Sequence, residues 1–197
     1  MKKIFALLLA FAAVFAFTAC SSDSSSSDDS VPIFSVTDVT GWDEIDWDDL
    51  TDETYGDWMV GEWDCKYRSI NNMEDEDDLK LYEGTVLLTI EGTYSSASVV
   101  FSEAEGDGVS NGTSTFSTLK NTMNKYYDEK LFDDAIAQLE KYGVTINWVH
   151  NKNVWKKVNP DRTKMEFYKS IVISGTYEGE TYVLTSQVNE SLVKRGE

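Results

Sequence analysis

The stretch Gly61-Glu62-Trp63-Asp64-Cys65-Lys66-Tyr67-Arg68 alternates apolar and charged side chains with a period of two. Trp63, Cys65 and Tyr67 fall on one side of an extended backbone, and the charged residues between them fall on the other. This alternation is typical of a β-strand with one buried face and one face toward water. The stretch therefore predicts a sheet that covers a core on one side.

Similar apolar-rich runs continue from here to the end of the chain, separated by turn residues. Glu91-Gly92, Asn159-Pro160-Asp161 and Glu178-Gly179 carry strong turn chemistry, and we also place a turn at Asn151-Lys152. The further strands that we expect span residues 79–90, 94–101, 114–116, 144–149, 153–158, 164–174, 181–188 and 192–195. Eight or nine short strands in meander order predict an all-β fold with antiparallel strands.

One segment, residues 117–142, breaks the strand pattern. Its apolar residues recur at spacings of three and four, which is the period of a helix, and Gly143 stands where a C-terminal cap belongs. The phase of the apolar residues slips near Tyr127, so the pattern fits two shorter helices as well as one. We expect this inserted helical segment to cover an open end of a barrel or a sheet face.

An up-and-down meander of about eight strands removes its unpaired edges by closing into a barrel. Gly61-Glu62-Trp63 matches the G-x-W motif of the first lipocalin strand, and Lys194-Arg195 falls where lipocalins place a basic residue on that tryptophan. Residues 59–197 thus resemble a lipocalin-like (calycin-type) β-barrel domain. The resemblance implies that Gly61, Trp63 and Arg195 close the barrel. The alternative is a β-sandwich in which Trp63 is an ordinary core residue.

The first nineteen residues have the features of a secretory signal peptide. Lys2 and Lys3 form a positively charged start, and no polar side chain occurs from Ile4 to Phe17. A run of this length is shorter than the roughly 20 apolar residues that span a bilayer. We therefore expect residues 1–19 to direct secretion and to be removed.

Phe17-Thr18-Ala19-Cys20 resembles the lipobox of bacterial lipoproteins, which implies that Cys20 carries the lipid anchor. The following residues of the 20–30 segment are only serine and aspartate, a composition that does not bury enough apolar surface to fold. They suit a flexible tether. The chain is expected to lie in the cell envelope, held at a membrane through Cys20. Ser21 and Ser22 lack the aspartate of inner-membrane retention, which points to the outer membrane.

Negative charge is concentrated near the tether. Residues 20–58 contain 12 acidic and no basic residues, whereas residues 59–197 contain 23 acidic and 15 basic residues. Such a field repels nucleic acid, so we exclude a nucleic-acid partner. Residues 31–58 also carry large aromatic side chains, which suit a strap packed on the domain better than a docking segment, because exposed tryptophans are rare. These aromatic residues are Phe34, Trp42, Trp47, Tyr55 and Trp58.

Motifs for catalysis, metal or cofactor binding are not evident. If Cys20 is lipidated, Cys65 has no cysteine partner and is expected to be a small buried side chain. His150, the one histidine, lies in a strand-turn context without a nucleophile motif. We therefore expect neither an enzyme nor a metal or cofactor site.

Two functions remain open. The first is a membrane-anchored barrel that binds or carries a small apolar ligand in its interior. The second is a cell-surface module with a filled barrel that binds protein or glycan. The large side chains that we expect to line or fill the interior are Tyr82, Phe101, Trp148, Trp155, Phe167 and Tyr182.

Overall fold

The computed structural model describes residues 35–51, 55, 58–72 and 79–196. The predicted signal peptide (residues 1–19), the lipidation residue Cys20 and the tether (residues 20–30) lie outside the described residues, as do residues 31–34 of the strap. Within the described part of the chain, no helix is both long and apolar enough to span a membrane.

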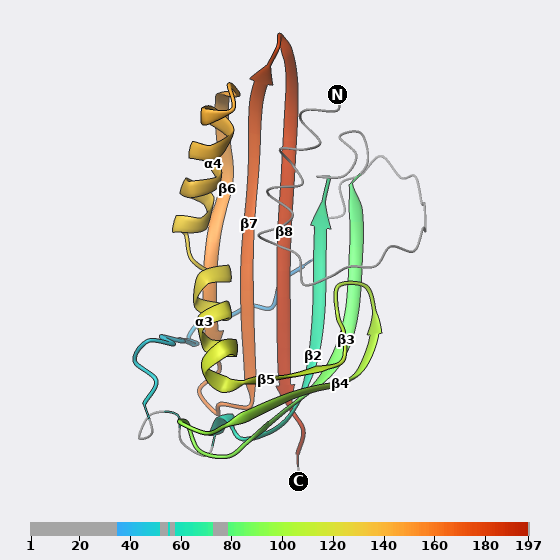
Figure 1. The fold of residues 1–197 in the computed structure, drawn as a ribbon, viewed down its shortest axis with the longest axis vertical. Coiled ribbons are helices and arrows are strands. Elements are labelled where there is room, and N and C mark those ends of the chain that lie inside the picture. Colours follow the sequence, from blue (N-terminus) through green and yellow to red (C-terminus); the bar gives the residue numbers. More distant parts are fainter. Residues whose placement is uncertain (1–34, 52–54, 56–57, 73–78, 197) are drawn as a thin grey trace.

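Eight strands and two helices follow one another along the described chain (Figure 1). The strands precede and follow a helical pair, as the sequence predicts. In chain order the elements are β1 (Asp43–Glu44), β2 (Gly61–Asn71), β3 (Lys80–Glu91), β4 (Ser98–Gly106), β5 (Gly112–Thr115), α3 (Phe116–Tyr126), α4 (Lys130–Lys141), β6 (Thr145–Val158), β7 (Lys164–Tyr177) and β8 (Glu180–Lys194).

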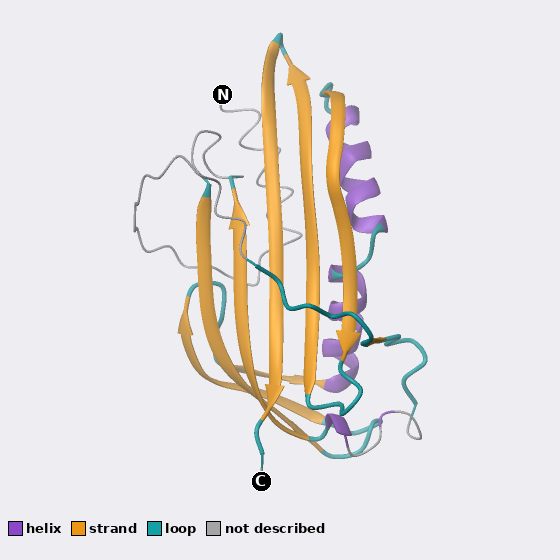
Figure 2. Ribbon diagram, turned by 180° about the vertical axis from the view of Figure 1, so that it is seen from behind, coloured by secondary structure: helices purple, strands orange, loops and turns teal. Residues whose placement is uncertain are grey.

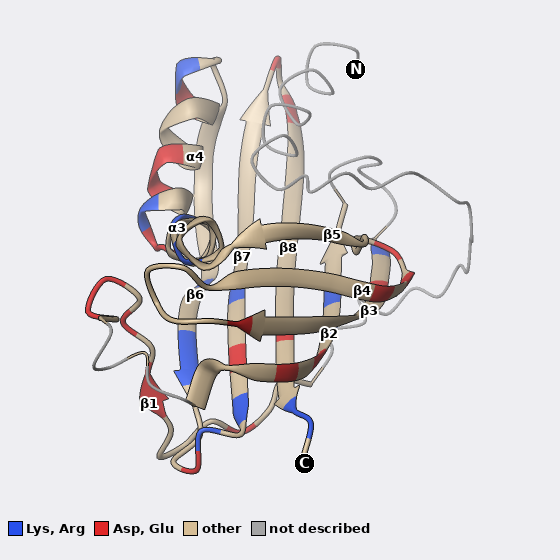
Figure 3. Ribbon diagram, turned by 60° about the horizontal axis from the view of Figure 1, so that its bottom comes forward, with Lys and Arg blue, Asp and Glu red and all other residues tan. Residues whose placement is uncertain are grey.

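All eight strands form one antiparallel sheet in the order β1-β6-β7-β8-β2-β3-β4-β5. The all-β prediction is confirmed at this level. The sheet is open in the described residues, because β1 and β5 stand at its two ends and do not pair with each other. The half from β2 to β5 curls round and crosses the lower end of β6, β7 and β8 (Figure 3).

The two faces of the sheet follow from strand alternation. On β7 the side chains of Met165, Phe167, Ile171 and Ile173 point to the inner face, where they join the two hydrophobic clusters. The residues between them point to the outer face. Residues of β6 and β8 that are paired with an inward residue of β7 also point inward, and those paired with an outward residue point outward.

One predicted turn and one predicted break between strands are absent from the structure. Residues 145–158 form the single strand β6, in which Asn151 has a φ of +53° at a bulge between His150 and Asn153. The Asn151-Lys152 pair is therefore a β-bulge and does not reverse the chain, since the same left-handed residue serves both structures. Likewise, the runs that we predicted at 181–188 and 192–195 belong to the single strand β8.

The helical segment is two helices, the second of the two alternatives that the sequence left open. Thr115 caps α3 by accepting a hydrogen bond from the backbone N–H of Thr118 at 3.2 Å. The chain breaks after Tyr126, and Gly143 ends α4 with a φ of +90°. Helix α4 packs through Phe132 and its neighbours on the inner face of β7.

The strap packs into the main core. Trp47 is 2% exposed and Tyr55 is 3% exposed, and both rings contact the ring of Phe116 at the start of α3. Trp47 also stacks on Phe167 of β7, with ring centroids 6.0 Å apart. Trp47 and Tyr55 therefore belong to the main core and lie between the two halves of the curled sheet.

A matched pair of tryptophans tests this core. Trp63 is fully buried, whereas Trp148 is 40% exposed. We expect Trp63→Ala to lower the free energy of unfolding by about 3–5 kcal/mol, because it leaves a large apolar cavity. Trp148→Ala should change it by less than about 0.5 kcal/mol. Urea unfolding followed by circular dichroism measures both, and equal losses in the two variants would contradict the assigned core.

Candidate functional site

The six residues predicted to line a ligand site do not converge on one cavity. Phe167 is fully buried in the main core, and Phe101 packs against that core at the same end of the sheet. Tyr82 and Tyr182 face the inner side by register, opposite Ser69 and Gly175. Four of the six thus share the inner face, spread along the length of the strands.

The other two, Trp148 and Trp155 of β6, lie on the outer face. Trp155 stacks on Tyr168 of β7 with centroids 5.1 Å apart, and Trp148 lies 4.7 Å from the ring of His150. Their register partners on β7, Ser174 and Tyr168, belong to the outward set. These two tryptophans therefore face away from the interior.

The basic residue over Trp63 is Lys194. Its Nζ lies 5.6 Å from the Trp63 ring and donates to the carbonyl oxygen of Trp58 at 2.9 Å. The indole N–H of Trp63 donates to the carbonyl oxygen of Met59 at 3.0 Å. Lys194 also lies 3.3 Å from where a Cβ of Gly61 would stand. Because neighbouring residues of a strand point to opposite faces, Lys194 covers the ring and Arg195 does not.

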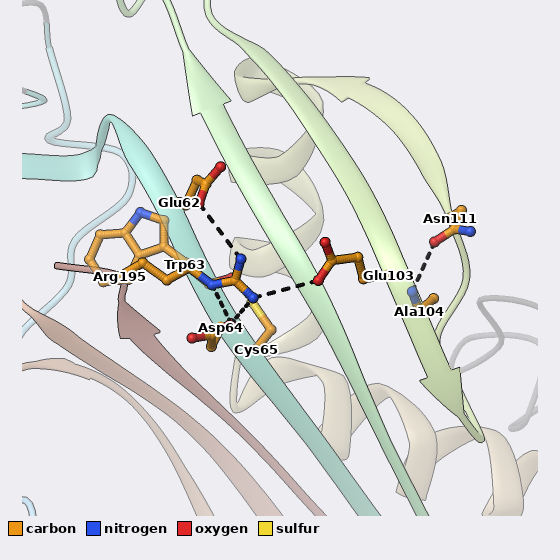
Figure 4. A network of polar contacts seen from close by, with 8 residues as sticks. All are labelled: Glu62, Trp63, Asp64, Cys65, Glu103, Ala104, Asn111 and Arg195. Carbon is orange, nitrogen blue, oxygen red and sulfur yellow. Dashed lines mark hydrogen bonds and ion pairs between the residues drawn. The ribbon is translucent and has the colours of Figure 1, made fainter. Parts of the chain in front are cut away.

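Arg195 instead joins an acidic cluster on the outer face (Figure 4). Its Nε and Nη2 both lie 2.8 Å from Oδ1 of Asp64, and its remaining ion pairs, to Glu62 and Glu103, are longer at 3.7 and 3.5 Å. The cluster joins β2, β4 and the chain after β8. Solvent screens these exposed pairs, so they orient the guanidinium more than they stabilise the fold.

A groove of about 550 Å³ begins at this cluster and runs over the outer face. Basic and acidic side chains both line it, with apolar and hydroxyl groups between them. Its lining residues are Thr37, Asp64, Cys65, Lys66, Arg68, Thr85, Val86, Leu87, Glu103, Glu166, Ser191, Val193 and Arg195. This mixture suits a ligand with polar groups of both signs.

The far end of the groove is closed by the start of the strap. Thr37 donates to Oε1 of the buried Glu166 at 2.6 Å, and Asn189 donates to Oε2 of the same carboxylate at 2.8 Å. Arg68 donates to the side-chain oxygen of Asn189 at 2.8 Å and to the carbonyl oxygen of Ser35 at 3.1 Å. Residues 35–42 are thereby held across the outer face, from β2 to β6 (Figure 2).

The inner face contains a second polar group, which sequence reasoning missed. Tyr127 donates to Oε1 of Glu190 at 2.9 Å, and Nζ of Lys169 lies 3.0 Å from the centroid of the Tyr126 ring. Burial lowers the pKa of Lys169 well below its ordinary value, although the carboxylate of Glu190 acts in the opposite direction. Burial likewise raises the pKa values of Glu190 and Tyr127.

Cys65 lies on the inner face beside this group. Burial, together with the carboxylates of Glu190 and Asp64, raises the pKa of its thiol. The protonated thiol is a poor nucleophile, which fits the expected role as a small packing residue. Within the described ranges, no three or more His, Cys, Asp or Glu side chains are placed to hold a metal ion.

Comparisons with protein families, with curated proteins and with solved structures found no match. The function is therefore argued from the chemistry of these surfaces.

The buried lysine makes a pH dependence measurable. Between the lowered pKa of folded Lys169 and the ordinary value of 10.5, the unfolded chain binds more protons than the folded one. The free energy of unfolding should therefore rise with pH in this window, by up to about 1.4 kcal/mol per pH unit. Urea unfolding at pH 7 and pH 9.5 should show this rise in the wild type and its loss in Lys169→Met.

The matched control for this prediction is Lys164→Met, which removes an exposed lysine from the same strand. It should keep the pH dependence of the wild type. An unchanged pH dependence in Lys169→Met would contradict the assignment of the rise to Lys169.

Proposed function

We propose that this chain is a lipid-anchored protein of the cell envelope, held at the outer membrane through Cys20, and that it binds its ligands on the outer face of an opened lipocalin-like barrel. The aromatic core packed between the two halves of the described sheet is the observation that carries this proposal. It favours the second of the two functions that the sequence left open, a binding module, over a carrier of a small apolar ligand.

The order of the strands supports the lipocalin-like architecture. β2 and β8, the first and last long strands, pair from Trp63 with Lys194 to Asn71 with Ser186. Pairing of the first and last strands is the step that closes an up-and-down barrel. The opening lies between β5 and the edge formed by β1 and β6, and the chain from β5 to β6 forms α3 and α4. Trp63 under Lys194 supplies the capped tryptophan that the resemblance implies.

The packing between the two halves of the sheet supports the placement of the binding surface outside. Trp47 and Phe116 occupy the space that an internal ligand would need, and Trp63, Tyr127 and Phe167 complete the same cluster with at most 2% exposure each. Side chains packed at this density leave little space for an apolar guest. The outer face, in contrast, carries the groove that starts at Arg195.

The groove suits a small polar ligand. Lys66 and Arg68 line it from β2, and the Glu103 carboxylate lines it from β4. Leu87 is 8% exposed and Val193 is 40% exposed, so the groove also offers apolar contact. Polar groups of this kind set orientation, while the apolar area contributes affinity.

A fatty-acid titration tests whether the binding surface is outside. A chain that starts at Ser21 keeps every described element, because the described residues begin at 35. We expect palmitate to leave its tryptophan fluorescence unchanged, and organic extraction to release no bound lipid, since the aromatic core is packed between the two halves of the described sheet. A saturable fluorescence change, or a lipid that co-purifies in equal molar amount, would overturn the proposal in favour of an internal carrier.

Metabolic labelling with a palmitate analogue tests the anchor separately. The wild-type chain should incorporate the label and fractionate with membranes, because acyl chains on Cys20 contribute about 0.8 kcal/mol per buried CH₂. Cys20→Ala should lose the label and leave the membrane fraction. Cys65→Ala is the matched control and should remain labelled. Equal labelling of Cys20→Ala would contradict the anchor.

A further inference from the structure

Four aromatic side chains form a strip on the outer face of β6 and β7. We define the outer aromatic strip as Trp148, His150, Trp155 and Tyr168. The rings occur in two pairs, Trp148 with His150 at 4.7 Å and Trp155 with Tyr168 at 5.1 Å. The register partners of Trp148 and Trp155 are six residues apart along β7, which is about 20 Å at the rise of an antiparallel strand.

A bulge is responsible for this alignment. Trp148 and Trp155 are seven residues apart, so regular alternation would place them on opposite faces. The bulge between His150 and Asn153 adds one residue to β6 and restores the same face to both. The backbone irregularity of β6 therefore assembles the strip.

Between its two ring pairs the strip has polar and uncharged surroundings, whereas Lys157 and Glu166 lie beside the lower pair. On the outer face between the two ring pairs and beside the upper pair, β6, β7 and β8 present hydroxyl and amide side chains and two valines. Those nearest the rings are Asn153, Ser170, Val172, Ser174, Thr185 and Gln187. In Figure 3 the upper part of β7 is tan, and red appears at the turn into β8 and at the upper end of β8. The whole chain has a net charge of −18.

The upper end of the strip is accessible from solvent, whereas Trp155 and Tyr168 at its lower end are half-buried and Ser170, Ser174 and Gln187 are buried. Trp148 is 40% exposed, Val183 beside it on β8 is 45% exposed, and His150 and Asn153 are also exposed. Residues 35–42 cross the outer face lower down, at the level of Glu166. Among the described elements, none crosses the upper halves of β6, β7 and β8 on this face (Figure 2).

We infer that the outer aromatic strip binds a neutral oligosaccharide chain, an assignment that rests on the proposed outer-face binding function and names its ligand class. Sugar rings present C–H faces that pack on indole and phenol rings, and hydroxyl groups that pair with side-chain amides and hydroxyls. Two ring pairs about 20 Å apart suit an extended polymer with repeating faces better than a single small molecule.

Charge separates this ligand from the other polymers that stack on aromatic rings. Single-stranded nucleic acid also stacks on such rings, yet it requires a positively charged groove. The one lysine on this face next to the strip, Lys157, is paired with Glu44 at 3.0 Å, and the acidic chain repels polyanions. A neutral glycan has no such electrostatic cost, so its chemistry matches the strip.

Titration calorimetry on the full-length protein in detergent tests the assignment. The probes are four neutral hexasaccharides: cellohexaose, xylohexaose, mannohexaose and maltohexaose. We expect at least one to bind, and Trp148→Ala to weaken that binding at least about tenfold, as removal of a central aromatic contact does. Trp155→Ala should also weaken it, with circular dichroism confirming that each variant is folded.

Tyr142→Ala is the matched control, because Tyr142 is an exposed aromatic residue, at 47%, that follows α4 and lies outside the strip. It should bind like the wild type. Failure of all four hexasaccharides to bind, or binding that Trp148→Ala leaves unchanged, would overturn the glycan assignment. A palmitate-binding interior would instead overturn the proposed function, so the two failures are distinguishable.

Discussion

The structure depends on the pairing of β2 with β8. These strands are about 120 residues apart in sequence, yet they pair over nine residues, from Trp63 with Lys194 to Asn71 with Ser186. This pairing joins the β2–β5 meander to the β6–β8 meander in a single sheet. It also determines the partners at the surface and in the core, since it places Lys194 over Trp63 and Glu190 beside Tyr67. Contacts of such long range close late and slowly in folding.

The curl of this sheet gives its faces different chemistry. The inner face has the strap and α3 packed on it, so Trp47 and Phe116 fill the space between the halves. The outer face has only the thin segment 35–42 across it in the described chain, and it is left with a polar groove and an aromatic strip. Binding chemistry therefore lies where the fold leaves side chains uncovered.

Sequence reasoning succeeded where local patterns determine structure. The alternation at residues 61–68 predicts β2 and the burial of Trp63, and the phase slip near Tyr127 indicates the break between α3 and α4. It failed where a shift of one residue in strand register determines which face of the sheet a side chain occupies. Asn151 has turn chemistry, but the same positive φ serves a bulge, and this bulge places Trp148 and Trp155 on one face.

The buried Lys169 illustrates a second limit. A lysine in a strand normally faces water, and nothing in its local sequence indicates otherwise. Its side chain points inward because Phe167 and Ile171 set the parity of β7, and Tyr126 and Glu190 lie on the elements that pack there. The inward direction of the Lys169 side chain becomes evident only from the pairing of β7 with its neighbouring strands. The whole outer groove shares the difficulty, since its residues come from six segments of the chain.

The bulges of β6 also affect whether the sheet edges of two copies can pair with each other. Above its short pairing with β1, β6 has no further partner strand among the described residues, and a straight free edge is a template for pairing with another copy. Register shifts at Ile146/Trp148 and His150/Asn153 interrupt its hydrogen-bonding ladder, and Lys152 is held by Asp133 of α4 at 2.7 Å. An irregular edge of this kind is a poor template for edge-to-edge pairing between copies.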